Sequence, residues 1–196
     1  MSFQRKSAFF EVIKTLTEAI KEDHEEMYEY FDNYKKCTGD ADAQARWARQ
    51  LTWEIARHAV GEEIVVYPLM EKHMGQEGMD LANGDRKEHQ LVKEQLYKLE
   101  SLTAGTNEFD TLINEVTRKF QDLPQLEPKL GHEGSQQAAA SFTRTKKFAP
   151  TRPHPSAPNK PPAETLVGFL ALPMDKLKDM FAKFPTEEMK AAAKDD

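Results

Sequence analysis

Hydrophobic residues recur at steps of three and four along most of the first 130 residues of the chain. This periodicity is that of amphipathic α-helices, each with one apolar face. Glycines at positions 75, 78 and 84 mark one of the connecting loops. The pattern predicts helices over residues 9–34, 42–73, 85–102 and 109–123. Helices of this length with short connections pack as antiparallel neighbours, so the chain is expected to be all-α, an up-down four-helix bundle.

Two polar residues interrupt the apolar stripe of the second predicted helix. His58 and Glu62 are one helical turn apart and occupy positions where neighbours such as Leu51 and Ile55 are apolar. Burying such groups without partners costs roughly 1–3 kcal/mol for each unsatisfied polar group. The pair is therefore either a buried His–Glu hydrogen bond or half of a metal site.

Single histidines take apolar positions in the first and third predicted helices as well. His24 precedes His58 by 34 residues, and His89 follows it by 31 residues. Each spacing corresponds to one helix of about 20–25 residues plus a loop, so antiparallel packing would bring all four groups to a similar depth. Histidines and carboxylates that face inward at one depth are how helical bundles build iron sites. The sequence thus predicts a metal site formed by His24, His58, Glu62 and His89.

The order of these motifs resembles the hemerythrin-like (HHE cation-binding) family over roughly residues 10–132. The resemblance is carried by Asp23-His24, by His58-x3-Glu62-Glu63 followed by Tyr67-Pro68-Leu69, and by Glu88-His89. It implies a four-helix bundle around a non-haem iron centre, usually di-iron, with His24, His58, Glu62 and His89 at ligand positions. Oxygen binding, iron handling and redox sensing all occur within the family, so iron and dioxygen are the implied ligands.

The chain departs from the family pattern in the fourth helix, where a second His-x3-Glu is expected. His132 is near the right place, but the residue four positions later is Gln136, and glycines at 131 and 134 each disfavour helix by about 1 kcal/mol. We expect a truncated fourth helix that lacks about 15–25 residues. His132 remains a candidate ligand, Glu63 is expected to face solvent, and at most one metal ion should be held tightly.

Composition and charge narrow the function classes. The chain has 196 residues, no apolar run long enough to span a membrane and no secretory signal at its start, so the cytoplasm is the expected location. Residues 1–140 carry a net charge of −9 and residues 141–196 a net charge of +3. An acidic bundle argues against nucleic acid as a partner. The single cysteine, Cys37, is expected to be a surface or partly buried thiol near the end of the first helix.

The C-terminal third differs in composition from the bundle. The predicted organisation is a bundle over residues 1–135, a basic, Pro-rich connector over 136–165, and an amphipathic helix with a polar tail over 166–196. Within the connector, the basic run at 144–147 is expected to be solvated and residues 136–148 to form a helix. The last helix is expected either to pack on the bundle through Phe169, Leu170, Leu177 and Phe181, or to dock on a partner protein or a membrane.

Two functions of different classes fit these observations. The first is a hemerythrin-type metal-binding protein that binds iron and serves oxygen binding, iron homeostasis or sensing. The second is a helical interaction module that keeps the bundle without the metal. The sequence shows neither an open coordination position nor a substrate pocket, so no catalytic residue is expected.

Overall fold

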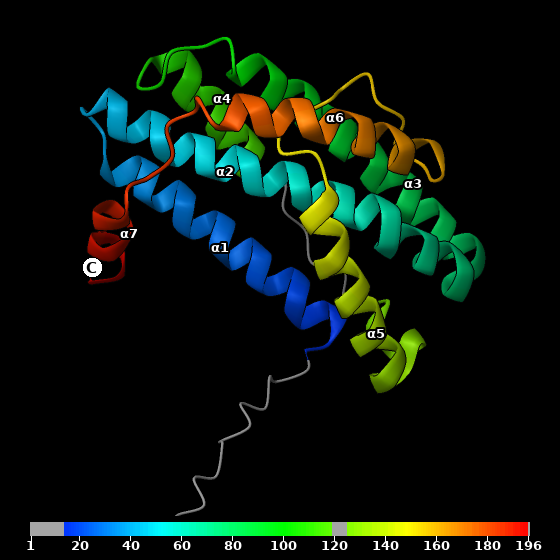
Figure 1. The fold of residues 1–196 in the computed structure, drawn as a ribbon. Helices are drawn as coiled ribbons and strands as arrows, with labels where there is room; N and C mark the ends of the chain where they lie inside the picture. The colour runs from blue at the N-terminus through cyan, green and yellow to red at the C-terminus, as the bar shows by residue number, and fades with distance from the viewer. Residues whose placement is uncertain (1–13, 119–124, 196) are drawn as a thin grey trace, which may run out of the picture.

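The computed structural model describes residues 14–118 and 125–195. All regular structure in these residues is helical, which confirms the predicted all-α class (Figure 1). The elements are α1 (Leu16–Lys36), α2 (Ala41–Gly61), the π-helical segment η1 (Glu62–Val66), α3 (Tyr67–Leu99), α4 (Asn107–Thr117), α5 (Glu127–Phe148), α6 (Ala163–Asp179) and α7 (Glu187–Asp195). None of the helices in this part of the chain combines the length and apolarity needed to cross a bilayer.

Side-chain caps fix the starts of the first two helices. Thr15 accepts a hydrogen bond from the backbone N–H of Glu18, whose side chain in turn accepts from the Thr15 backbone N–H. Asp40 caps α2 by accepting from the N–H of Ala43. Cys37 is partly buried just after α1, as predicted. The predicted start of the first helix, at residue 9, lies outside the described residues.

The bundle interior contains two apolar clusters. One contains residues from α1, α2, α3 and α4, including Met27, Leu51 and Leu96. The other contains residues from α1, η1, α3 and α5, including Ile20 and Phe142. The candidate site residues of α1 and α2 lie between these clusters in sequence, so the site forms a polar layer between two apolar ones.

The predicted loop at residues 75–84 is confirmed as a break in the helix but is shorter than predicted. α3 consists of two helical stretches that meet at a kink at Gly75, with φ 62° and ψ −133°. The chain reverses at this kink, since Arg86 binds Glu71 and His89 lies beside Tyr67. Ala82 is fully buried in the second apolar cluster. A glycine in a helix costs about 1 kcal/mol relative to alanine, which tertiary packing of the surrounding helix offsets.

The predicted helix over residues 136–148 is confirmed as the main part of α5. The helix begins earlier, at Glu127, and is kinked at Gly131, where φ is 66°. The predicted domain boundary after residue 135 falls inside α5, whose Ala138 and Phe142 belong to the second apolar cluster. The predicted end of the fourth helix, at residue 123, lies outside the described residues, and α4 ends at Thr117.

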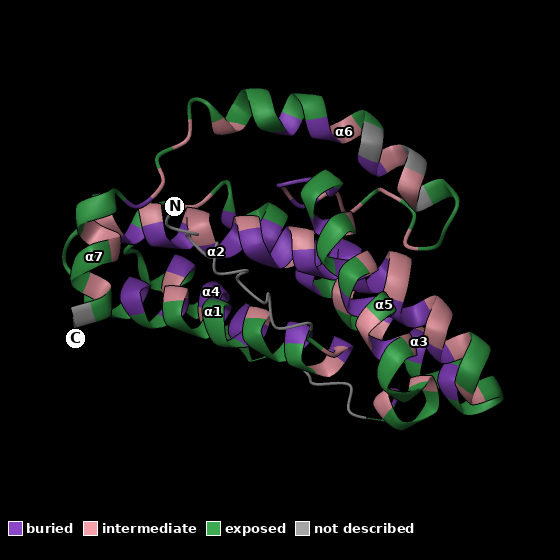
Figure 2. Ribbon diagram, turned by 60° about the horizontal axis from the view of Figure 1, so that its bottom comes forward, coloured by how far each residue is buried: buried purple, intermediate pink, exposed green. Residues whose placement is uncertain are grey.

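The orientation of α6 contradicts the first of the two predicted alternatives, packing of its apolar residues on the bundle. Leu170, Leu177 and Phe181 were expected to contact the bundle, but they are exposed by 72%, 50% and 82%; the side chain of Phe169 is outside the described ones. The reason is that the opposite face carries Asp175 and Asp179, which bind the connector and the bundle. Figure 2 shows α6 lying along the outside of the molecule. α7 instead packs Met189 and Ala193 against the first apolar cluster.

Candidate metal centre

Three of the four predicted core ligands meet at one point in the bundle. His24 on α1 and His58 on α2 approach with their Nε2 atoms 3.1 Å apart. The Oε1 atom of Glu62, at the start of η1, lies 3.4 Å from His58 Nε2. All three residues are buried, and one ligand atom from each lies within 4.8 Å of the others. Two imidazoles and a carboxylate that converge in this way can hold a metal ion.

The fourth predicted residue, His89 on α3, meets the other oxygen of Glu62. Its Nε2 atom is 3.1 Å from Glu62 Oε2. The hydroxyl of Tyr67 lies 3.1 Å from the same nitrogen and 3.5 Å from the same oxygen. Glu62 therefore connects the two histidines of α1 and α2, on one side, with His89 on the other.

The Nδ1 atoms of His58 and His89 each contact a further carboxylate. Asp23 Oδ2 lies 2.9 Å from His58 Nδ1, and Glu63 Oε1 lies 3.2 Å from His89 Nδ1. A carboxylate at Nδ1 orients an imidazole and leaves Nε2 available as a ligand. The prediction that Glu63 faces solvent is wrong, because the side of η1 that carries it is covered by α3 and Glu63 is 0% exposed.

Two lysines complete these contacts. The ammonium of Lys146, on α5, binds both Asp23 and Glu54. The ammonium of Lys93, on α3, binds Glu63. Lys146 belongs to the basic run that was predicted to be solvated. Arg144 and Lys147 are exposed as predicted, but the prediction is wrong for Lys146, which α5 packs against α1 and α2. Among the four carboxylates, only Glu62 has no lysine or arginine partner in the described part of the chain.

The structure does not bring His132 to this cluster. His132 is exposed on α5 and lies 3.0 Å from the side chain of Gln136. The α5 residues that cover the site are Phe142, whose ring meets the His58 ring edge-on at 5.5 Å, and Lys146. α5 approaches closely because α2 has a glycine at this point: a Cβ on Gly61 would lie 2.8 Å from the Phe142 ring.

The charges of the cluster shift its pKa values strongly. Burial acts to lower the pKa of His58, but the charge of Glu62 and the contact with Asp23 outweigh it and raise that pKa to about 9. His89 likewise has a pKa raised to about 9, because its contacts with Glu62 and Glu63 outweigh burial. Burial acts to raise the pKa of Glu62, but the two histidines hold it well below its usual value. Both histidines are therefore protonated at neutral pH unless another cation replaces their protons.

The residues present fit a metal ion. Glu62 Oε1 is a buried oxygen that receives no hydrogen bond of normal geometry from the described residues, with His58 Nε2 3.4 Å away. A metal ion that replaced the imidazole protons would satisfy this oxygen and the two neighbouring imidazole nitrogens together. Imidazole and carboxylate are the ligand types that iron and neighbouring transition metals prefer.

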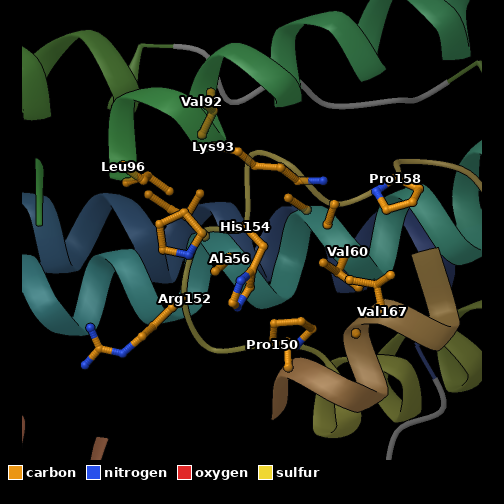
Figure 3. Close-up of a pocket in the computed structure, with 16 residues that line it drawn as sticks. Ala56, Val60, Val92, Lys93, Leu96, Pro150, Arg152, His154, Pro158 and Val167 are labelled. Carbon is orange, nitrogen blue, oxygen red and sulfur yellow. The ribbon is translucent and has the colours of Figure 1, made fainter. Parts of the chain in front are cut away.

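An apolar pocket lies beside the residues that surround the cluster (Figure 3). It is lined by Ala56 and Val60 of α2, by Val92 and Leu96 of α3, and by Pro150 and Val167 of the C-terminal segment. Lys93 also lines it, and its ammonium binds Glu63, the partner of His89. The pocket therefore shares one residue, Lys93, with the contacts that surround the site.

A buried histidine and glutamate cluster between antiparallel helices defines a class, the helical-bundle metal-binding proteins. The chain belongs to one family of that class: the model of the hemerythrin HHE cation-binding domain matches residues 15–125. The chain is also 48% identical to an uncharacterized hemerythrin-like protein of Schizosaccharomyces pombe over 179 residues, which is 87% of this chain and 88% of the relative. No solved structure matches the chain.

Sequence reasoning missed several residues that support the cluster. Asp23 and Glu63 were quoted only as neighbours of motif residues, and their adjacency to His24 and Glu62 was the available signal. Lys93 follows His89 by one helical turn, so its place on the same face could have been found. Lys146 could not, because it contacts α1 over a separation of 123 residues.

Proposed function

We propose that the protein binds one non-haem iron ion per chain through His24, His58 and Glu62, with His89 at the second oxygen of Glu62. The observation that carries this proposal is the convergence of three buried ligand atoms within 4.8 Å. The membership in a cation-binding family supports it independently. Iron is proposed over other metals because the family resemblance implies it and the ligand set of imidazole and carboxylate suits it.

A single ion follows from the residues of α5. The helix that covers His58 contributes a phenyl ring and an ammonium, and neither can ligate a metal. His132, the candidate for a fifth ligand, is exposed and contacts Gln136 instead. Lys93 and Lys146 already neutralise carboxylates that a second ion would need.

We further propose that the site serves oxygen binding or sensing, or iron homeostasis. An iron ion bound there would supply a centre to which small diatomic molecules bind. Asp23 and Glu63 would hold the two imidazoles in place, and Phe142 would exclude water from His58. The apolar pocket that Lys93 helps to line suits the binding of a small apolar molecule such as dioxygen. The proposal assigns no catalytic reaction.

The alternative function is a metal-free helical interaction module. It is favoured by the ion pairs of Lys93 and Lys146, which satisfy three of the four buried carboxylates without a metal. Metal analysis of the purified full chain, together with its ultraviolet-visible spectrum after iron(II) is added anaerobically and air is then admitted, separates the two. The proposal expects about one equivalent of iron retained through dialysis. Retention of none would establish the alternative, and two equivalents would show that a further carboxylate completes a di-iron centre.

A further inference from the structure

The C-terminal segment exposes an apolar ridge that the metal site does not explain. Leu170, Met174, Leu177 and Phe181 are spaced at i, i+4, i+7 and i+11, so they lie on one face of α6 and the turn that follows it. They are exposed by 72%, 58%, 50% and 82%, and the neighbouring Met180 is exposed by 79%. Single exposed apolar residues are ordinary, whereas a contiguous ridge of large ones marks an interaction surface.

The opposite face of α6 is held against the molecule by polar contacts. Asp175 is fully buried and accepts hydrogen bonds from the backbone N–H groups of Thr151 and Arg152, while its Oδ2 lies 2.9 Å from His154 Nε2. Asp179 accepts a hydrogen bond of 2.6 Å from Arg49 of α2. These contacts fix the rotation of the helix about its axis, so the ridge cannot turn inward without breaking them.

The same contacts determine the charge beside the ridge. Both aspartates in the second half of α6 are turned inward, Asp179 against Arg49 and Arg152 and Asp175 against backbone N–H groups, whereas Lys176 and Lys178 remain exposed. The second half of α6 therefore presents positive charge to solvent beside the ridge, which complements an anionic partner.

We propose that the outer face of α6 docks on an anionic lipid bilayer surface, with the ridge inserted among the acyl chains and the lysines at the headgroups. A ridge that spans residues 170–181, about 16 Å along a helix, suits shallow insertion of an interfacial helix. It does not suit a second copy of this chain, because a stable interface needs roughly 20–30 residues on each side and the ridge offers far fewer. This proposal is independent of the metal.

Vesicle co-sedimentation of the full chain tests it. We expect the protein to bind vesicles of phosphatidylcholine and phosphatidylserine at 3:1, and to bind pure phosphatidylcholine vesicles at least about tenfold more weakly. Raising the salt from 0.1 to 0.5 M should weaken binding, because the Debye length falls well below 10 Å. No sedimentation with the anionic vesicles, or equal sedimentation with both kinds, would overturn the proposal.

Variants assign the binding to the ridge. The double variant L177S/F181S should lose at least about tenfold in binding, since each side chain contributes roughly 1.5–3 kcal/mol of apolar burial. K176E/K178E should lose at least about fivefold for each lysine. The matched control is L91S/Y97S, which changes two exposed apolar residues of α3. An equal loss of vesicle binding in the control would contradict the assignment. Light scattering that shows a dimer for the wild type and a monomer for L177S/F181S would contradict it too, because the ridge would then be a contact between two copies. If L177S/F181S fails to fold, the charge variant still decides.

Discussion

His24 Nε2 and His58 Nε2 face each other at 3.1 Å in the interior of the bundle. Two nitrogens that bind one ion at about 2.1 Å and at right angles lie about 3.0 Å apart, so this separation fits two adjacent positions on a metal. His58 Nδ1 is already engaged by Asp23, which leaves its Nε2 for the ion. A hydrogen bond between the two imidazoles has the same length, so binding of an ion would replace this bond.

Two histidine substitutions should separate site residues from surface residues. His58→Ala removes a nitrogen next to both His24 and Glu62, and we expect it to abolish iron retention. His132→Ala should leave iron retention unchanged within about twofold, because His132 is exposed and contacts only Gln136 among the contacts described for it. Isothermal titration with iron(II) under anaerobic conditions measures both. Loss of binding in His132→Ala would return this histidine to the ligand set.

The metal-free protein should lose stability as the pH rises. The folded pKa values of His58 and His89, about 9, are above the unfolded value of 6.5, so their protonation stabilises the fold. This contribution is complete below pH 6.5 and is lost as the pH rises through 9. Urea unfolding of the metal-free protein at pH 6, 7.5 and 9.5 should show the decline, and His58→Gln should flatten it.

Metal binding should show the opposite pH dependence. An ion must displace the protons of these imidazoles, so iron affinity should rise with pH up to about 9. The metal-dependent increase in melting temperature should therefore grow with pH over the same window. Zinc(II) serves as a probe that does not oxidise. An increase that is constant across the window would mean that His58 and His89 are neutral in the metal-free fold.

Lys146 acts as a tethered cation beside the site, and its removal should destabilise the metal-free protein. Lys146→Met removes the ammonium from Asp23, which keeps His58, and from Glu54, which keeps Arg57, so it should cost about 1.5–3 kcal/mol of unfolding free energy. The freed carboxylate charge favours a metal ion, so added zinc(II) should raise the melting temperature more than in wild type. Lys35→Met, which removes a surface partner of Asp32, is the control and should change little. An equal metal response in Lys146→Met and wild type would contradict the role of Lys146 as a competing cation.

The positions of the four candidate ligands were predictable because each follows from local periodicity. His24, His58 and His89 interrupt apolar stripes, and a helix of fixed rise converts their spacing into depth. The orientation of Glu63 was not predictable in this way. A rotation of 100° per residue from His58 assigns Glu63 to another face, but α3 buries that face too, and only tertiary structure shows this.

The C-terminal segment shows a different limit of sequence patterns. The apolar stripe of α6 correctly predicts a helix, but burial of the stripe was inferred from hydrophobicity alone. The structure buries Asp175 instead, because the backbone N–H groups of the connector and His154 give it three hydrogen-bonding contacts. Such contacts depend on a turn of the chain that periodicity does not encode.

The close approach of α5 to the site should depend on Gly61. Gly61 is helical, with φ −58° and ψ −44°, so alanine is compatible with its backbone and would by itself gain up to about 1 kcal/mol. The added Cβ would, however, lie 2.8 Å from the buried ring of Phe142. Overpacking of this kind costs about 1–3 kcal/mol, so we expect Gly61→Ala to lower stability overall and to displace Phe142 from His58.

A glycine on another helix provides the control for this substitution. Gly84 on α3 has nothing within 4 Å of its Cβ position, so Gly84→Ala should be neutral or stabilise the fold by up to about 1 kcal/mol. Urea unfolding of both variants compares the two effects directly. Adding Phe142→Leu to Gly61→Ala should restore part of the lost stability, because the smaller side chain lacks the ring atoms that the new Cβ would meet. If Gly61→Ala is as stable as Gly84→Ala, α5 can move away from α2 at little cost, and the cover that Phe142 provides over His58 is loose.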